Sequence, residues 1–127
     1  MRRKDPKRAV ELLNVASPLE LAQPTDLAVS LCPVYLRGEA YLMLHDGTAA
    51  AAEFQKFIDH YGLVENFSWG ALARLGLARA YALDAAKDPT SRRKAKIAYQ
   101  DFLALWKDAD SDVPILIQAK AEYAKLR

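Results

Sequence analysis

Two blocks of residues recur in the same order, forty-odd residues apart. Residues 38–42 read GEAYL and residues 78–82 read ARAYA, while residues 53–58 read EFQKFI and residues 98–103 read AYQDFL. Chance rarely produces two separate recurrences at nearly one distance. A period of tens of residues is typical of stacked supersecondary units, each too small to bury its apolar face alone. The sequence therefore predicts an array of structural repeats.

Apolar residues within each block follow the period of an α-helix. A stripe with the spacing i, i+4, i+7, i+8 and i+11 occurs twice, as Ala50, Phe54, Phe57, Ile58 and Tyr61 and again as Ala95, Tyr99, Phe102, Leu103 and Trp106. Ala9, Leu13 and Ala16 repeat its beginning near the start of the chain. The chain holds only 5 glycines and 6 prolines, which suits helices better than a turn-rich β protein. We expect an all-α fold of about six helices.

Turn and capping residues divide this single expected domain, residues 1–127, into units. We expect the second helix of an incomplete unit at 5–16, helix pairs at 26–61 and 68–107, and a terminal capping helix at 112–126. Helix starts are indicated by Asp5-Pro6, by a turn at Asp46-Gly47, by Thr90 or Ser91 as a cap after Asp88-Pro89, and by Asp112-Val113-Pro114.

Residues 17–33 contain three prolines and leave two interpretations open. Asp26 could cap a helix that runs through Pro33 with a kink, or Pro33 could open the helix proper. The connection at 62–67 is equally open, since either segment could cover a groove or extend it.

The two helix pairs resemble the tetratricopeptide (TPR) repeat. That family has Trp-x2-Leu-Gly-x2-Tyr in the first helix and Ala-x3-Phe in the second. The matching residues are Gly38-x2-Tyr41 with Ala50-x3-Phe54, and Leu77-Ala78-x2-Tyr81 with Ala95-x3-Tyr99. The interval from Tyr81 to Ala95 is longer than the family's, and Val34, Arg37 and Arg74 depart from the signature. The resemblance implies a right-handed α-α solenoid.

Longer segments resemble the C-terminal TPR region of large bacterial serine/threonine protein kinases; among them are PVYLRGEAYL and AYQDFLALWKDAD. The resemblance implies that this chain is the end of a repeat array that follows a kinase domain. Kinase activity is not expected of the chain itself, because it has no Gly-rich phosphate loop, no His-Arg-Asp stretch and no Asp-Phe-Gly. A lone Cys32 and the lack of a signal sequence favour the cytoplasm. If a membrane span precedes the array in the longer protein, an extracytoplasmic location follows instead.

The residue inventory predicts neither an enzyme nor a cofactor or metal site. His45 and His60 lie at opposite ends of one expected helix, and Cys32 is flanked by apolar residues and proline. Asp108, Asp110 and Asp112 lack the glycine and glutamate of a calcium loop. A net charge of +2 argues against a nucleic-acid partner. The sequence contains no apolar run of 18 residues, so we expect no direct contact with a membrane.

Recognition of a protein or peptide is the function that the TPR resemblance implies. In that family the first helices of successive pairs line a concave groove. The corresponding residues here are Tyr35, Glu39, Leu42, Met43, Leu72, Leu75, Arg79, Leu83 and, from the capping helix, Gln118. Tyr35 and Arg79 are the best candidates, because aromatic and guanidinium groups are enriched at binding hot spots.

A second hypothesis is self-association, or docking within a longer polypeptide, without a separate ligand. The apolar face of the helix at residues 6–16 would have no preceding helix to cover it, so an exposed solenoid end could form a homodimer.

Overall fold

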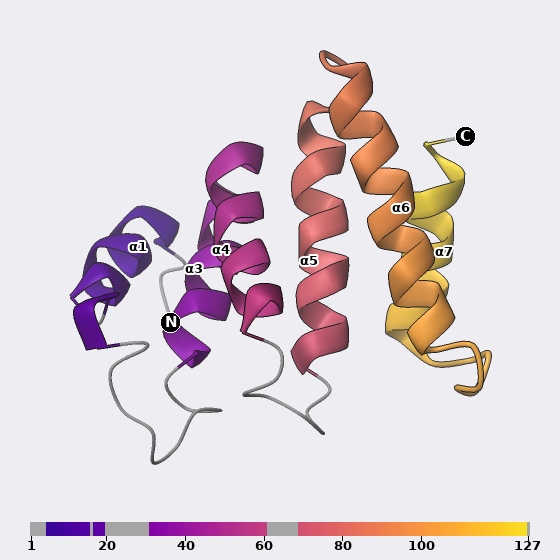
Figure 1. Ribbon diagram of the computed structural model, residues 1–127, viewed down its shortest axis with the longest axis horizontal. Helices are drawn as coiled ribbons and strands as arrows, with labels where there is room; N and C mark the ends of the chain where they lie inside the picture. The colour runs from indigo at the N-terminus through magenta and orange to yellow at the C-terminus, as the bar shows by residue number, and fades with distance from the viewer. Residues whose placement is uncertain (1–4, 16, 20–30, 61–68, 127) are drawn as a thin grey trace.

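The structure is a computed structural model that describes residues 5–15, 17–19, 31–60 and 69–126, and every regular element in these ranges is helical (Figure 1). The elements are α1 (Pro6–Asn14), the short 3-10 helix η1 (Ser17–Leu19), α3 (Cys32–Met43), α4 (Gly47–Asp59), α5 (Trp69–Asp84), α6 (Pro89–Leu105) and α7 (Pro114–Ala124). The prediction of an all-α fold with about six helices is confirmed for the described residues.

Aspartates cap three of the helices. Asp5 Oδ1 accepts a hydrogen bond from the Arg8 amide at 3.2 Å, and Asp46 Oδ1 accepts one from the Ala49 amide at 3.0 Å. Asp88 accepts from two amides at the start of α6, those of Thr90 and Ser91. The N-cap of α6 is therefore Asp88, and the expectation of Thr90 or Ser91 was wrong because the proline after Asp88 already occupies the first helical position.

Pro33 lies in the first turn of α3, which begins at Cys32. This start fits the interpretation in which the proline opens the helix, since a proline in the first turn leaves no needed amide unpaired. The alternative cap at Asp26, the stripe residues Ala16 and Tyr61, and the connection at 62–67 lie outside the described residues.

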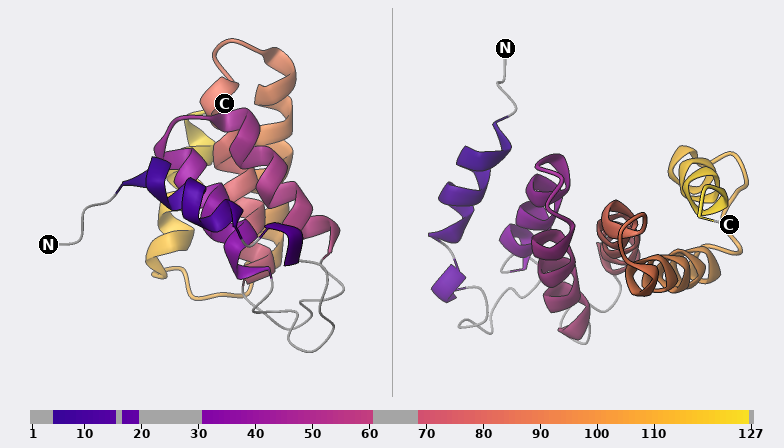
Figure 2. Two further views of the ribbon diagram at one scale, coloured as in Figure 1. Left: turned by 90° about the vertical axis from the view of Figure 1, so that its left-hand side faces the viewer. Right: turned by 90° about the horizontal axis from the view of Figure 1, so that it is seen from above.

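Each described α-helix packs against the next one along the chain, from α1 to α7, and α3 also contacts α5 (Figure 1, Figure 2). Two hydrophobic clusters result, one within α3, α4 and α5 and the other within α5, α6 and α7. Helix α5 contributes Ala73 and Leu77 to the first cluster, and Leu75 and Ala78 to the second. It is therefore buried on two sides and joins the two halves of the core.

The second helix of each expected pair buries the stripe that the sequence predicts. Ala50, Phe54 and Phe57 of α4 are fully buried, and Ala95, Tyr99 and Phe102 of α6 are 0–2% exposed. The remaining described members of the stripes, Ile58, Leu103 and Trp106, pack against the same clusters from partly buried positions. The predicted helical faces of α4 and α6 are thus confirmed.

The ring of Phe54 lies between two glycines on neighbouring helices. A Cβ atom added to Gly38 of α3 would lie 2.7 Å from the Phe54 Cζ atom, and one added to Gly76 of α5 would lie 2.5 Å from it. Real Cβ atoms do not approach a ring this closely, so both positions need a residue without a side chain. Both glycines lie against the same outer edge of the Phe54 ring, formed by its Cζ and Cε atoms, so α3 and α5 both approach one aromatic side chain. This close approach explains why glycine is present inside two helices.

We expect Gly76→Ala to destabilise the fold by about 1–3 kcal/mol, because the added methyl group meets the Phe54 ring. This loss outweighs the gain of roughly 1 kcal/mol that the same change brings in an unobstructed helix. Urea unfolding monitored by circular dichroism measures it. In a Phe54→Leu background the shorter side chain leaves more room, so Gly76→Ala should be less harmful there. Strictly additive effects of the two substitutions would contradict this packing.

Candidate functional site

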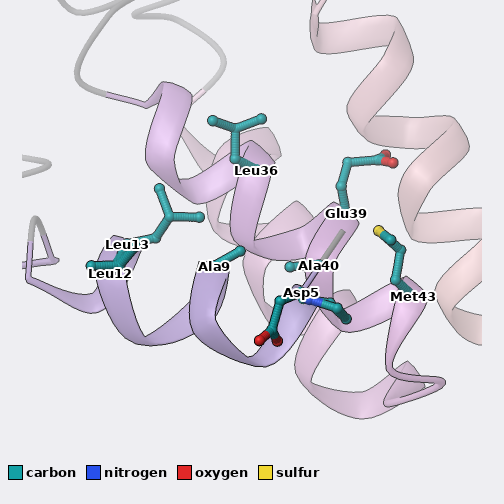
Figure 3. A pocket seen from close by; sticks show the side chains of 9 residues that line it. Asp5, Ala9, Leu12, Leu13, Leu36, Glu39, Ala40 and Met43 are labelled. Atoms are coloured by element: carbon teal, nitrogen blue, oxygen red, sulfur yellow. The ribbon is translucent and has the colours of Figure 1, made fainter. Parts of the chain in front are cut away.

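An open groove of about 530 Å³ lies between α1 and α3 (Figure 3). Its walls are mostly apolar and consist of Asp5, Pro6, Ala9, Leu12 and Leu13 from the first helix and its cap, and Leu36, Glu39, Ala40 and Met43 from the other. Leu12 is 63% exposed, Met43 50% and Leu36 45%. Three large apolar side chains that remain this exposed around one hollow form the kind of surface that marks an interaction site.

The charged residues that line this α1/α3 groove are Asp5 and Glu39. Asp5 is exposed and also caps α1, while Glu39 is half-buried on α3. Among the described lining residues none is basic, although Arg79 of α5 interacts electrostatically with Glu39. The groove therefore combines an apolar floor with an acidic rim, which favours a ligand that carries positive charge beside apolar groups.

Arg37 fixes α1 in the position that forms the groove. Its side chain is 1% exposed; Nη1 donates to the Leu13 carbonyl oxygen at 3.0 Å, and Nη2 donates to Glu53 Oε2 at 3.0 Å. One guanidinium thus connects the end of α1 with α3 and α4. Arg37 therefore has a structural role at the junction of three helices.

A second polar cluster connects the last three helices. Arg79 of α5 makes a bidentate pair with Glu122 of α7, with Nε to Oε2 at 2.9 Å and Nη2 to Oε1 at 3.0 Å. The Tyr99 hydroxyl of α6 donates to the same Oε2 at 2.9 Å. Burial, followed by the hydrogen bond to the Glu122 carboxylate, raises the pKa of the Tyr99 hydroxyl above its ordinary value.

Tyr35 packs its ring into the first hydrophobic cluster. Its ring centroid lies 5.6 Å from that of Phe54, 6.0 Å from that of Phe57 and 5.2 Å from that of Trp69, mostly in edge-to-face arrangements. Burial, with a further contribution from the Glu39 carboxylate, raises the pKa of its hydroxyl to about 12. Tyr35 therefore supports the core as well as the surface near Glu39.

The structure places the residues predicted to line a concave groove in several different settings. The α1/α3 groove brings together Glu39 and Met43. Tyr35 and Arg79 are engaged in the contacts above, and Leu42 packs against the first cluster. Leu72 is half-buried, while Leu83 and Gln118 are exposed outside the α1/α3 groove. Leu75 is 1% exposed in the second cluster, and this corrects the expectation of a surface role, because a side chain enclosed by α6 and α7 cannot contact a partner.

Sequence reasoning did not assign Leu12, Leu13 and Leu36 to a shared site. The sequence predicted that the first helix has an uncovered apolar face. It did not predict that α3 lies beside this face. The available signal was the pair of Leu36 and Ala40, which share one helical face on the side of α3 away from Gly38 and its contact with α4.

The histidines and the cysteine show ordinary structural settings. His45 has a φ of 57° in the turn after α3, and His60 Nδ1 lies 2.7 Å from the Lys56 carbonyl oxygen at the end of α4. Cys32 is a half-buried free thiol. Within the described ranges, no three or more His, Cys, Asp or Glu side chains are grouped so that they could hold a metal ion.

Comparison of the chain with protein-family models, with curated proteins and with solved structures finds no match. Among the described helices, none combines the length and the apolar character that crossing a membrane requires.

We expect Arg37→Met to destabilise the fold by about 3 kcal/mol, because it leaves the half-buried Glu53 carboxylate without its cation. The matched control is Arg92→Met, since Arg92 also donates to a carbonyl oxygen, that of Leu126, but its side chain is exposed. The control should cost less than about 1 kcal/mol. Equal losses in urea unfolding would show that Arg37 is not an anchor.

The raised pKa of Tyr35 predicts a loss of stability at alkaline pH. The unfolded chain releases this proton near pH 10.0, whereas the folded chain holds it until about pH 12. Stability should therefore be unaffected by this group below pH 10 and should fall as pH rises toward 12. The free energy of unfolding, measured across this range, should fall less steeply in Tyr35→Phe than in the wild type. Identical slopes would argue against a buried, neutral Tyr35.

Proposed function

We propose that the chain is a protein- or peptide-binding scaffold of the helical-repeat, TPR type, built as a right-handed α-α solenoid. Two features support this proposal. Successive helices pack against their neighbours in chain order, and the stripes of α4 and α6 are buried at corresponding positions. In repeat proteins of this kind each unit contacts its neighbours, and extended surfaces are left for binding. The proposal assigns no reaction to the chain.

The α1/α3 groove is the single observation that carries the binding proposal. Leu12, Leu36 and Met43 expose apolar surface around it, although burying such surface is favourable by about 25 cal/mol per Å². The two walls are helices, so the hollow between them matches the shape of a third helix lying along both. An amphipathic helix that places apolar residues into such a groove is a recurring mode of peptide recognition.

The chemistry of the groove specifies the ligand further. Its apolar floor favours a helix with apolar residues at i, i+3 or i+4, and i+7, and its rim of Asp5 and Glu39 favours lysine or arginine beside that stripe. Outside the α1/α3 groove, the exposed residues that the TPR resemblance assigns to a concave surface, including Leu83 and Gln118, contact the partner as well in this proposal.

We further propose that the scaffold belongs to a longer bacterial signalling protein with a serine/threonine kinase domain and acts in the cytoplasm. The supporting observation is the set of segments that resemble the C-terminal repeats of such kinases, for example PVYLRGEAYL and AYQDFLALWKDAD. In such a protein the scaffold would position partners relative to the kinase domain.

The test is a selection from a displayed library of helical peptides, followed by binding measurements with fluorescence anisotropy. Selected peptides should carry an apolar i, i+4, i+7 stripe flanked by basic residues. Leu36→Asp should weaken their binding by at least about tenfold, because it places a carboxylate on the apolar floor.

The matched control is Leu105→Asp on α6, because Leu105 is 54% exposed and lies outside the groove. This variant should bind the selected peptides like the wild type. Failure to select any peptide, or equal binding by both variants, would contradict the proposed groove function.

A further inference from the structure

The outer face of α7 carries an apolar stripe between two lysines. Ile117 is 53% exposed, and Ala121 and Ala124, at i+4 and i+7, are also exposed. Lys120 and Lys125 are exposed on either side of this stripe, given a rotation of about 100° per residue. The opposite face is committed to the core through Leu116, Ala119, Tyr123 and Leu126. Helix α7 is therefore apolar on two faces. One face packs into the second hydrophobic cluster, and the other is exposed in the described part of the chain.

We propose that the outer face of α7 docks into the α1/α3 groove of a second copy of this chain. The inference rests on the proposed function, because it names the partner of that same groove. The features expected of a ligand helix, an i, i+4, i+7 apolar stripe with flanking positive charge, are those of Ile117, Ala121 and Ala124 with Lys120 and Lys125.

The charges of the two faces are complementary. Among its described lining residues the groove contributes the carboxylates of Asp5 and Glu39, while the α7 face contributes Lys120 and Lys125. Electrostatic complementarity of this kind orients a helix in a groove and suppresses wrong partners. Because the charges lie at exposed rims, association should weaken as the salt concentration rises.

The packing within the chain provides a precedent for the docked arrangement. Helix α3 contacts α4, the second helix of its own expected pair, and also α5, the first helix of the next expected pair. A helix in the α1/α3 groove would have the corresponding two neighbours, since α1 carries the beginning of the α4 stripe. The small side chains of Ala121 and Ala124 permit the close approach that Gly38 and Gly76 provide within the core.

The two faces lie at opposite ends of the row of helices, with α1 at one end and α7 at the other (Figure 1, Figure 2). A copy therefore cannot fill its own groove. Contact between two different faces is heterologous, so each added copy leaves one free groove and one free α7 face. Association should proceed head to tail beyond the dimer, unless the geometry closes a ring.

Sedimentation velocity and light scattering test the proposal with two variants, Leu12→Asp in the groove and Ile117→Asp on α7. The average mass of the wild type should rise over about a hundredfold range of concentration. Each variant alone should remain monomeric. An equimolar mixture should form a heterodimer and nothing larger, because it contains one intact groove and one intact α7 face per pair.

Two control variants match the substitutions in type and exposure. Ile97→Asp, at a position 50% exposed on α6, corresponds to Ile117→Asp, and Leu105→Asp corresponds to Leu12→Asp. Both controls should associate like the wild type, and circular dichroism should show all four variants to be folded, since each replaced side chain is largely exposed.

A wild type that stays monomeric at all concentrations would overturn the proposal, and so would a mixture of the two variants that stays monomeric. Association that persists in either single variant would overturn it too. Failure of this self-association proposal can be distinguished from failure of the proposed groove function. If only self-association fails, selected peptides still bind to the monomeric wild type and bind weakly to Leu36→Asp.

Discussion

The contact of Phe54 with Gly38 and Gly76 fixes the distance among three helices, and the remaining geometry depends on it. The ring is fully buried, so α3 and α5 approach α4 as closely as a bare backbone permits. Helix α5 then continues the arrangement, because its other face carries Leu75 and Ala78 into the second cluster. The position of α7 relative to α3 thus follows from two successive packing layers that share one helix.

Polar anchors hold the two ends of this apolar core. Arg37 attaches α1 through the Leu13 carbonyl oxygen and Glu53, while Arg79 and Tyr99 attach α7 through Glu122. An anchor of this kind fixes a helix at a few atoms and does not require its whole apolar surface to be buried. This accounts for exposed Leu12 on α1 and exposed Ile117 on α7, which belong to the faces that we propose bind each other.

The sequence predicted those features that depend on local periodicity. The stripes of α4 and α6 and the all-α class were predictable, because burial of one helical face imposes a period near 3.6 residues. The anchors were not, since the hydrogen bonds of Arg37 and Arg79 join residues 16 to 43 positions apart. The site was predicted only in part for the same reason. Glu39 and Met43 were identified, whereas Leu75 is buried because α5 lies between two clusters, and Leu36 is 45% exposed on the wall of the α1/α3 groove.

The account depends on whether the α1/α3 groove is a binding surface and α7 is its complement. The most direct measurement is a series of methyl NMR spectra of the wild-type chain at increasing concentration. The account predicts shifts at Leu12, Leu36 and Met43 on one side, and at Ile117 and Ala121 on the other, with the methyl groups of Ile97 and Leu105 unchanged. Spectra that do not change with concentration, or shifts centred on Ile97 and Leu105, would contradict it.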